Sequence, residues 1–429
     1  MRCKASLYIF VSFVFLLVWS SLTAAGVSEQ AKLVASDGEA EDYFGRSVSI
    51  SGDYAIVGAY GKEGNEPENG AAYIYKRDGT NWTEQAKLVA PDAKKWDLFG
   101  ASVSISGDYA LIGATGVDDK GKDSGSAYIF KRNGETWTEQ AKLFASDGVA
   151  DDRFGDAVSI DGDYAIIGAY GDDDKGTFSG SAYIFKRNGE TWTEQAKLVA
   201  SDGEENDFFG RYVSISGDYA AVGVYLDDDK GNASGSVYIF KRKPKGWFNP
   251  EMWTEQAKLV ASDGAFGDCL GCSVSISGDY VVAGAYLDSD EGKRYFGSAY
   301  VFKRSGKTWS EQAKLVASDG EAEDYFGQSV SISGDCIVIG AYGDDDRKKY
   351  SGSAYIFTYD GEKWNEEAKF FASDADKNDF FGQWVSISGK YLIIGASGNS
   401  EKGEYSGSAY IFKCDSVGCG LKDRVRNRE

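Results

Sequence analysis

The stretch FGDAVSIDGDYAIIGAYGDDDKGTFSGSAYIF, residues 154–185, decides the fold of this chain. It is one copy of a unit that recurs seven times, and its last segment, G-S-A-Y-I-F, marks the period most clearly. The glycines that open the seven versions of this segment are spaced by 55, 55, 55, 62, 55 and 55 residues: Gly70, Gly125, Gly180, Gly235, Gly297, Gly352 and Gly407. A fixed period of this kind is typical of stacked units that each bury an apolar face against the next.

Each unit contains four short strand candidates separated by turn residues. In the third copy they are residues 157–160, 164–169, 181–185 and 192–200. The second candidate is apolar or small on both faces, which indicates burial between neighbouring layers, whereas the fourth mixes Glu, Gln and Lys with apolar residues. Four strands per unit, graded from buried to wet, predict the blade of a β-propeller.

The two ends of the chain predict how the ring closes. The fourth-strand sequence E-Q-A-K-L first occurs at residues 29–33, before any first strand, and the last copy stops after residues 407–412. We therefore expect an all-β, seven-bladed β-propeller of four-stranded blades, in which the N-terminal strand completes the last blade and leaves no open edge. An open β-solenoid is the alternative, but it needs capping repeats, and the terminal copies are ordinary in sequence.

Three segments are expected along the chain: a signal peptide at 1–25, the propeller at 26–413 and a short polar tail at 414–429. The first segment has Arg2 and Lys4 before an apolar run and small residues up to Ala25, which is typical of a secretory signal. A membrane anchor is the competing interpretation, but the run is shorter than the roughly 20 apolar residues of a span. The prediction is a secreted or cell-surface protein with no stable membrane span after cleavage.

Composition excludes several classes of function. The 429 residues carry a formal net charge of -21, whereas a nucleic-acid partner would require a basic surface. The sequence contains no histidine, which excludes Ser-His-Asp and Cys-His catalysis and His-ligated metal sites in their usual forms. Any metal must therefore bind to oxygen atoms or to cysteines.

Five cysteines remain once the predicted signal is removed. A disulfide between Cys414 and Cys419 is expected to fix the C-terminal tail in an oxidising compartment. Cys269 and Cys272 form a C-x-x-C sequence without a surrounding βαβ pattern, so a local disulfide or two buried thiols is favoured over a redox or zinc pair. Cys336 stands where the other copies have Tyr and is interpreted as a small core residue.

The mutual spacing of F-G, S-G-D-Y, G-A and G-S-A-Y-I-F resembles the FG-GAP repeats of integrin α chains and of many secreted proteins, over residues 29–413. Leu270-Gly271 is the one departure from F-G, which is otherwise present at Phe44, Phe99, Phe154, Phe209, Phe326 and Phe381. The resemblance implies a β-propeller whose relatives are mostly adhesion or binding proteins, some of them accompanying enzymes.

The same resemblance implies calcium sites in the acidic loops that follow the second strand, because the family's calcium loop reads D-x-D-x-D-G-x-x-D. The loops that keep part of this pattern give the candidate ligands Asp172, Asp174, Asp227, Asp229, Asp288, Asp290, Asp344 and Asp346. A hard cation requires about six to eight oxygens, and carboxylates at alternating loop positions supply them. The closing Asp is absent from these loops, so solvated acidic loops are the alternative.

Two further elements recur in a way that indicates structure rather than function. A D-x-x-x-x-D sequence, as at Asp37 and Asp42, precedes the F-G or L-G of all seven copies. We expect its side chains to accept hydrogen bonds from backbone N–H groups of the connecting turn. Six fourth strands begin at a tryptophan such as Trp192, for which packing between blades is favoured over a sugar platform.

The fourth copy has an expanded hairpin between its third and fourth strands, residues 241–252. This loop carries Trp247 and Phe248 beside two lysines, Lys243 and Lys245. Function tends to lie on loops that depart from a scaffold, so both aromatic residues are candidate partner-binding residues. The alternative is that both rings fold back onto the blade.

We therefore expect a non-enzymatic binding or adhesion propeller that presents loops to a protein or carbohydrate partner, with Ca²⁺ as the one candidate cofactor. The alternatives are a polysaccharide-acting enzyme with a site at the channel, because paired carboxylates are plentiful, and a structural surface-layer protein. A catalytic site requires one blade to differ at its channel-facing residues. The copies look nearly identical there, as at Ile160, Ile215 and Ile276, which argues against an enzyme.

Overall fold

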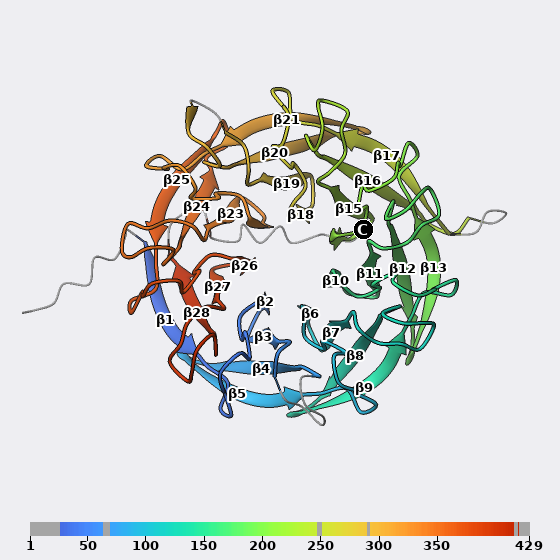
Figure 1. Ribbon diagram of the computed structural model, residues 1–429, viewed down its shortest axis with the longest axis horizontal. Coiled ribbons are helices and arrows are strands. Elements are labelled where there is room, and N and C mark those ends of the chain that lie inside the picture. Colours follow the sequence, from blue (N-terminus) through green and yellow to red (C-terminus); the bar gives the residue numbers. More distant parts are fainter. Residues whose placement is uncertain (1–25, 63–68, 247–250, 290–291, 416–418, 420–429) are drawn as a thin grey trace, which may run out of the picture.

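The computed structural model is a closed ring of seven blades around a central channel (Figure 1). It describes residues 26–62, 69–246, 251–289, 292–415 and 419. Each blade is a four-stranded antiparallel sheet, with its first strand at the channel and its fourth on the outer wall. The predicted all-β, seven-bladed propeller is confirmed.

The first four blades consist of β2 (Ser47–Ser51), β3 (Tyr54–Ala59), β4 (Ala71–Asp78) and β5 (Asn81–Leu88); β6 (Ser102–Ser106), β7 (Tyr109–Ala114), β8 (Ser126–Asn133) and β9 (Thr136–Leu143); β10 (Val158–Asp161), β11 (Tyr164–Ala169), β12 (Ser181–Asn188) and β13 (Thr191–Leu198); and β14 (Tyr212–Ser216), β15 (Tyr219–Val224), β16 (Ser236–Lys243) and β17 (Met252–Leu259). The last three consist of β18 (Val274–Ser277), β19 (Tyr280–Ala285), β20 (Ser298–Ser305) and β21 (Thr308–Leu315); β22 (Ser329–Ser333), β23 (Cys336–Ala341), β24 (Ser353–Tyr359) and β25 (Trp364–Phe370); and β26 (Trp384–Ser388), β27 (Tyr391–Ala396), β28 (Ser408–Cys414) and β1 (Val27–Leu33).

The N-terminal strand closes the ring. β1 pairs antiparallel with β28, so that Leu33 lies opposite Ala409 and Val27 lies opposite Cys414. In Figure 1 the first and last coloured segments lie side by side in the seventh blade. The predicted closure is confirmed, and the open solenoid is excluded.

The apolar core lies between blades rather than within one blade. The second and third strands are buried on both faces, as in β11, and their side chains meet those of the adjoining blade. One such cluster joins Ile129 of the second blade to Phe154 and Ile167 of the third. Because each blade buries its faces against its neighbours, its stability depends on both adjoining blades.

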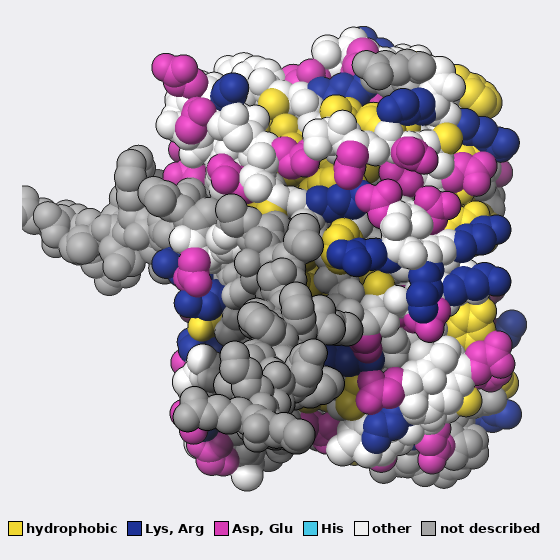
Figure 2. Space-filling model, turned by 90° about the vertical axis from the view of Figure 1, so that its left-hand side faces the viewer, with side chains coloured by type: hydrophobic (Ala, Val, Ile, Leu, Met, Phe, Trp, Pro, Cys, Tyr) yellow, Lys and Arg dark blue, Asp and Glu magenta, His cyan; other side chains and the backbone are white. Residues whose placement is uncertain are grey.

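Serine side chains connect the first strands around the channel. The backbone N–H of Val103 donates to Ser47 Oγ at 2.9 Å, and that of Ile105 donates to Ser49 Oγ at 3.2 Å. On the outer wall, Lys and Arg side chains alternate with Asp and Glu side chains (Figure 2). Ion pairs also link neighbouring hairpins, such as Lys76 with Glu135 at 2.8 Å.

The fourth-strand tryptophans pack between blades, as predicted. Trp253 lies edge-on to Tyr164 of the preceding blade, with ring centres 6.0 Å apart, and Trp137 meets Tyr54 in the same way at 6.1 Å. The guanidinium of an arginine lies over the same tyrosine, as Arg242 does over Tyr164. These side chains are therefore part of the seams and not a sugar platform.

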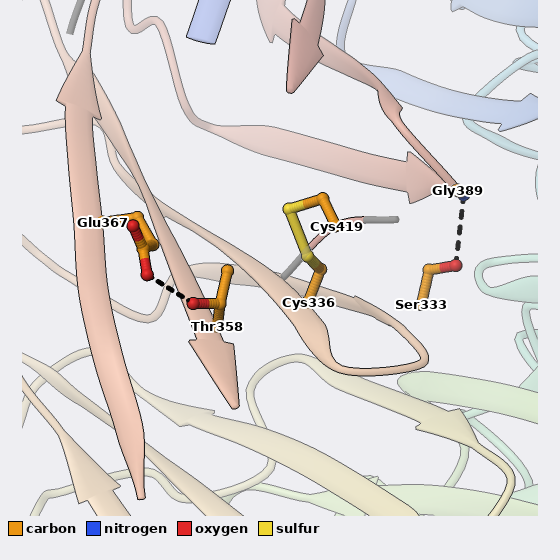
Figure 3. Close-up of a disulfide and its surroundings, with 6 residues drawn as sticks. All are labelled: Ser333, Cys336, Thr358, Glu367, Gly389 and Cys419. Carbon is orange, nitrogen blue, oxygen red and sulfur yellow. Dashed lines mark hydrogen bonds between the residues drawn. A yellow bond between two sulfur atoms is a disulfide. The ribbon is translucent and has the colours of Figure 1, made fainter. Parts of the chain in front are cut away.

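One seam lacks this Tyr–Trp pair and contains a disulfide instead (Figure 3). Cys336 replaces the tyrosine, Val27 replaces the tryptophan, and Cys336 is bonded to Cys419, with their Cα atoms 5.4 Å apart. The predicted Cys414–Cys419 pair is wrong, because the chain after β28 returns to the sixth blade, where Cys336 is buried.

Cys269 and Cys272 are two buried thiols that are not bonded to each other. Burial raises the pKa of both thiols, to about 11 for Cys269. A raised pKa leaves little thiolate at neutral pH, so the structure favours the prediction of inert buried cysteines over a redox pair.

Candidate functional sites on the loop face

We call the side of the ring that carries the second-to-third-strand loops and the blade connections the loop face. At each seam the glycine of G-S-A-Y-I-F meets the next blade's F-G or L-G in an isolated bridge, as between Gly180 and Phe209. A Cβ atom on Gly180 would lie 2.1 Å from the Phe209 carbonyl oxygen, and its φ is +79°. Only glycine fits there. The contact between the G-S-A-Y-I-F glycine and the F-G or L-G motif therefore holds the acidic loop of one blade against the connection that leads into the next blade.

Each acidic loop surrounds a lysine of the E-Q-A-K-L strand. In the third blade, Lys197 Nζ lies 2.9 Å from the carboxylate of Asp147, 2.7 Å from that of Asp172 and 2.6 Å from that of Asp174. Burial lowers the pKa of Lys197, but its hydrogen bonds to these carboxylates raise the pKa by more, and the net pKa lies above the ordinary value. We call a lysine with its surrounding carboxylates a lysine centre.

The lysine centre recurs around the ring, with Nζ–oxygen distances between 2.5 and 3.0 Å. The further centres are Lys258 with Asp202, Asp227 and Asp229; Lys314 with Asp263 and Asp288; Lys369 with Asp319, Asp344 and Asp346; Lys142 with Asp92 and Asp119; Lys32 with Asp374 and Glu401; and Lys87 with Asp37.

These contacts involve the predicted calcium ligands directly. Asp290 lies outside the described residues, and each of the other seven meets a lysine ammonium. In the described part of the chain, no cluster of three or more acidic or cysteine side chains is arranged to hold a metal. An ammonium group with three N–H donors matches three carboxylates, whereas Ca²⁺ needs about six to eight oxygens. As arranged, the loops fit a lysine and not a resident calcium ion, and calcium binding stays a prediction.

The predicted turn role of the D-x-x-x-x-D sequence is confirmed for its second Asp, whereas its first Asp contacts side chains. Its second Asp accepts a hydrogen bond from the connecting turn, as Asp152 does from the Val149 N–H at 2.7 Å. Its first Asp accepts one from a buried tyrosine, as Asp147 does from Tyr183 at 2.8 Å. Burial raises the pKa of Asp152 to about 6 and that of its counterpart Asp324 to about 7.

Trp247 and Phe248, the predicted partner-binding residues, lie outside the described residues. Glu251, which follows them, is held by the preceding blade: its carboxylate lies 2.6 Å from Lys186 Nζ and 2.7 Å from Tyr164 Oη. The equivalent Glu190 binds Lys131 in the same way, so the expanded hairpin ends in an ordinary seam contact.

Sequence reasoning missed a set of stacked aromatic side chains on the loop face. The residue before F-G stacks on rings from both adjoining blades, as Tyr43 does on Tyr60 at 5.2 Å and on Tyr405 at 5.9 Å. These rings are half-buried and occur at four of the seven seams: Tyr43, Tyr60 and Tyr405; Tyr170, Phe178, Phe208 and Tyr225; and Tyr286, Tyr295, Tyr325, Tyr342, Tyr350 and Phe380. We call them the rim aromatics.

The channel opens on the loop face into a cavity of about 420 Å³, which we call the channel mouth. The residue after F-G or L-G differs between blades, and six of the seven line this cavity: Arg46, Ala101, Asp156, Arg211, Gln328 and Gln383. The expectation of nearly identical channel residues is wrong at this end. Ile160, Ile215 and Ile276, on which it rested, are buried between blades.

The two arginines of the channel mouth differ in their partners. Arg211 is 3.2 Å from Asp156, and its guanidinium lies over the ring of Tyr170. Burial raises the pKa of Asp156, and the nearby arginines only partly offset this effect. Arg46 lies over the ring of Trp384 at 4.9 Å and has no acceptor or ion-pair partner among the described residues. The aligned F-G motifs were the signal that could have located this site.

A sequence model of the FG-GAP repeat matches the chain seven times, at residues 27–75, 82–130, 137–185, 192–240, 253–302, 309–357 and 364–412. The chain belongs to the FG-GAP repeat family. Each match of this FG-GAP protein begins in the fourth strand of one blade and ends in the third strand of the next. The family repeat therefore spans a seam, where the lysine centre and the rim aromatics lie. FG-GAP repeats occur typically in extracellular or surface proteins.

Among solved structures, a chain of "Crystal Structure of Mitotic Checkpoint Complex" is similar to the FG-GAP protein, with a TM-score of 0.53 and 13% identity. The match covers 97% of this chain and 100% of that chain, and at this identity it shows the fold alone. A search of curated proteins found no significant match. Within the described ranges, no helix has the length and hydropathy that a membrane crossing requires.

Proposed function

We propose that this FG-GAP protein is a secreted or cell-surface binding protein that engages a protein or carbohydrate partner with its loop face. Family membership supports a binding or adhesion role in general terms. The rim aromatics are the observation that carries the proposal, because they place half-buried rings at four seams on one face. Rings held on loops by a rigid scaffold are frequent contact residues in protein and sugar recognition.

The proposed role is non-enzymatic. Among the described residues that line the channel mouth, Asp156 is the single carboxylate, and it is paired with Arg211. Glycoside hydrolysis ordinarily uses two carboxyl groups on either side of the bond. In the acidic loops, Asp172, Asp174 and their counterparts in the fourth and sixth blades contact lysines and are not free carboxylates.

Secretion is the second element of the proposal. The disulfide between Cys336 and Cys419 supports it, because such bonds persist in oxidising compartments. The expected signal, residues 1–25, lies outside the described residues. N-terminal sequencing of protein secreted by a host cell should begin at residue 26, and recovery of a chain that still starts at residue 1 would contradict this.

The binding role is tested with arrays of glycans and of extracellular proteins, probed with the full chain. Phe208→Ala and Tyr325→Ala each remove the central ring of one aromatic cluster and should abolish the strongest signal. The control is Lys307→Ala, because Lys307 is exposed in the hairpin between β20 and β21, on the opposite face of the ring. The proposal fails if no array component binds, or if the control loses binding as the two ring variants do.

A further inference from the structure

We propose that the channel mouth binds a small sugar carboxylate, such as a hexuronate, with Arg46 holding the carboxylate group. This site is separate from the rim aromatics, and the proposal does not depend on the loop-face partner. It is carried by the cavity, by the differences between blades and by hydrogen-bond donors that lack acceptors.

The side chains at the channel mouth differ between blades. The strands on either side keep the S-G-D-Y and G-S-A-Y-I-F patterns in most copies, but the two positions after F-G read Arg-Ser, Ala-Ser, Asp-Ala, Arg-Tyr, Cys-Ser, Gln-Ser and Gln-Trp around the ring. The inner strands bring most of these side chains to one cavity. Different side chains around one cavity can contact the different chemical groups of a small ligand. Seven identical side chains could not make such distinct contacts.

Donors without acceptors are grouped where the seventh blade meets the first. The guanidinium of Arg46 lies over the ring of Trp384 and donates to no acceptor among the described residues, and the buried indole N–H of Trp384 has no acceptor there. Ser397 Oγ donates to Gln383 Oε1 at 2.6 Å, which leaves the Gln383 amide N–H groups as donors. Buried donors are costly to leave unpaired, so this part of the cavity suits a ligand rich in acceptors.

The charge of the cavity favours an anion. Two arginines, Arg46 and Arg211, share one carboxylate, Asp156, and only Arg211 forms an ion pair with it. The cavity is therefore positive by one charge inside a protein whose net charge is -21. A guanidinium presents two parallel N–H groups that match the two oxygens of a carboxylate.

The dimensions and walls of the cavity favour a sugar acid over a simple anion. Its volume of about 420 Å³ is far larger than one carboxylate group and lies in the range of small-molecule sites. The aromatic rings of Tyr60 and Tyr212 line it together with the amide of Gln328 and serine side chains. Rings pack against the C–H faces of a sugar, and amides and hydroxyls pair with its hydroxyl groups.

Isothermal titration calorimetry of the full chain tests this site, with sodium glucuronate as the probe and glucose as its neutral match. We expect glucuronate to bind and glucose to bind at least about tenfold more weakly, because a charge-assisted hydrogen bond is lost. Arg46→Gln should weaken glucuronate binding by a similar factor. Arg153→Gln should not, because Arg153 lies outside the cavity lining and is paired with Asp123 at 3.1 Å.

Three results would overturn the proposal: no heat with glucuronate, equal binding of glucose, or unchanged binding in Arg46→Gln. Tighter binding of inorganic phosphate than of glucuronate would overturn the assignment to a carboxylate. Circular dichroism melting of each variant verifies that its fold is retained. If Phe208→Ala loses its array partner but still binds glucuronate, the two sites are independent, and either one can fail without the other.

Discussion

The lysine centres and the channel mouth lie on the same face of the ring and differ in almost every other respect. A lysine centre repeats in all seven blades, and its charges are paired within the protein, as with Lys197. The residue type at the channel mouth varies between blades, and donors such as Arg46 and Trp384 lack hydrogen-bond acceptors among the described residues. The repeated residues of the lysine centres thus belong to the scaffold, whereas the variable residues of the channel mouth form a surface that a ligand can contact.

Replacing the lysine of a lysine centre should reduce the stability of the protein more than any other substitution considered. Lys197→Met leaves Asp147, Asp172 and Asp174 close together without their shared cation. We expect a loss of about 2–3 kcal/mol in the free energy of unfolding, below the value for a fully buried pair because two of these carboxylates reach solvent. Urea unfolding measures it. The control is Lys175→Met in the same loop, an exposed position where a change within about 0.5 kcal/mol is expected.

The stability of the protein should depend on pH through the buried carboxyl group of Asp324, the second Asp of a D-x-x-x-x-D sequence. Burial raises the pKa of Asp324 to about 7, against an ordinary value of 3.8. Between pH 4 and pH 7, Asp324 is therefore protonated in the folded protein and ionised in the unfolded chain. The free energy of unfolding should then fall as pH rises from 4 to 7, by on the order of 2 kcal/mol from this residue.

The variant Asp324→Asn keeps an oxygen acceptor for the Glu321 N–H and removes the titration. Its melting temperature should therefore rise relative to that of the unmodified protein as pH increases from 4 to 7. Asp345→Asn, at an exposed position of the same blade, serves as the comparison. Parallel melting curves for Asp324→Asn and the unmodified protein would show that Asp324 titrates normally.

Adding calcium should have a smaller effect on stability, and it tests whether the lysine centres are closed to other cations. If ammonium groups keep the lysine centres occupied in the unmodified protein, its melting temperature will be the same in calcium and in chelator. Lys197→Met exposes three carboxylates, so millimolar calcium should restore about 1 kcal/mol of its stability. A calcium-dependent shift in the unmodified protein would instead support the calcium sites that the family resemblance implies.

Substitutions at the channel mouth should have the smallest effect on stability. Arg46→Gln and Gln328→Ala remove side chains that have no described hydrogen-bond partner and face a cavity. We expect changes within about 0.5 kcal/mol in urea unfolding. A loss comparable to that of Lys197→Met would remove the distinction between scaffold and ligand site.

The sequence was sufficient to predict the fold, because the period counts the blades and the displaced E-Q-A-K-L segment shows the closure. The capping role of Asp152 was also predictable, because the turn is local. The lysine centres were not, since Lys197 reaches Asp172 across 25 residues, and its strand reads as an ordinary polar outer strand.

The disulfide and the channel mouth needed the structure for different reasons. Nothing local to Cys419 indicates that the chain returns to Cys336 in the sixth blade. The variation after F-G, by contrast, was visible in the sequence. Its meaning depended on knowing that those positions, and not the isoleucines of the first strands, face the channel.

The disulfide at the Tyr–Trp-free seam also decides how the ring carries mechanical tension. A pull on the chain beyond Cys419 passes through the bond to Cys336 and enters β23, the second strand of the sixth blade. The pairing of β28 with β1 is bypassed, so the closing strands do not unzip under such a load. In a surface protein tethered from that end, the load would reach the pairing of β28 with β1 only after the disulfide is reduced.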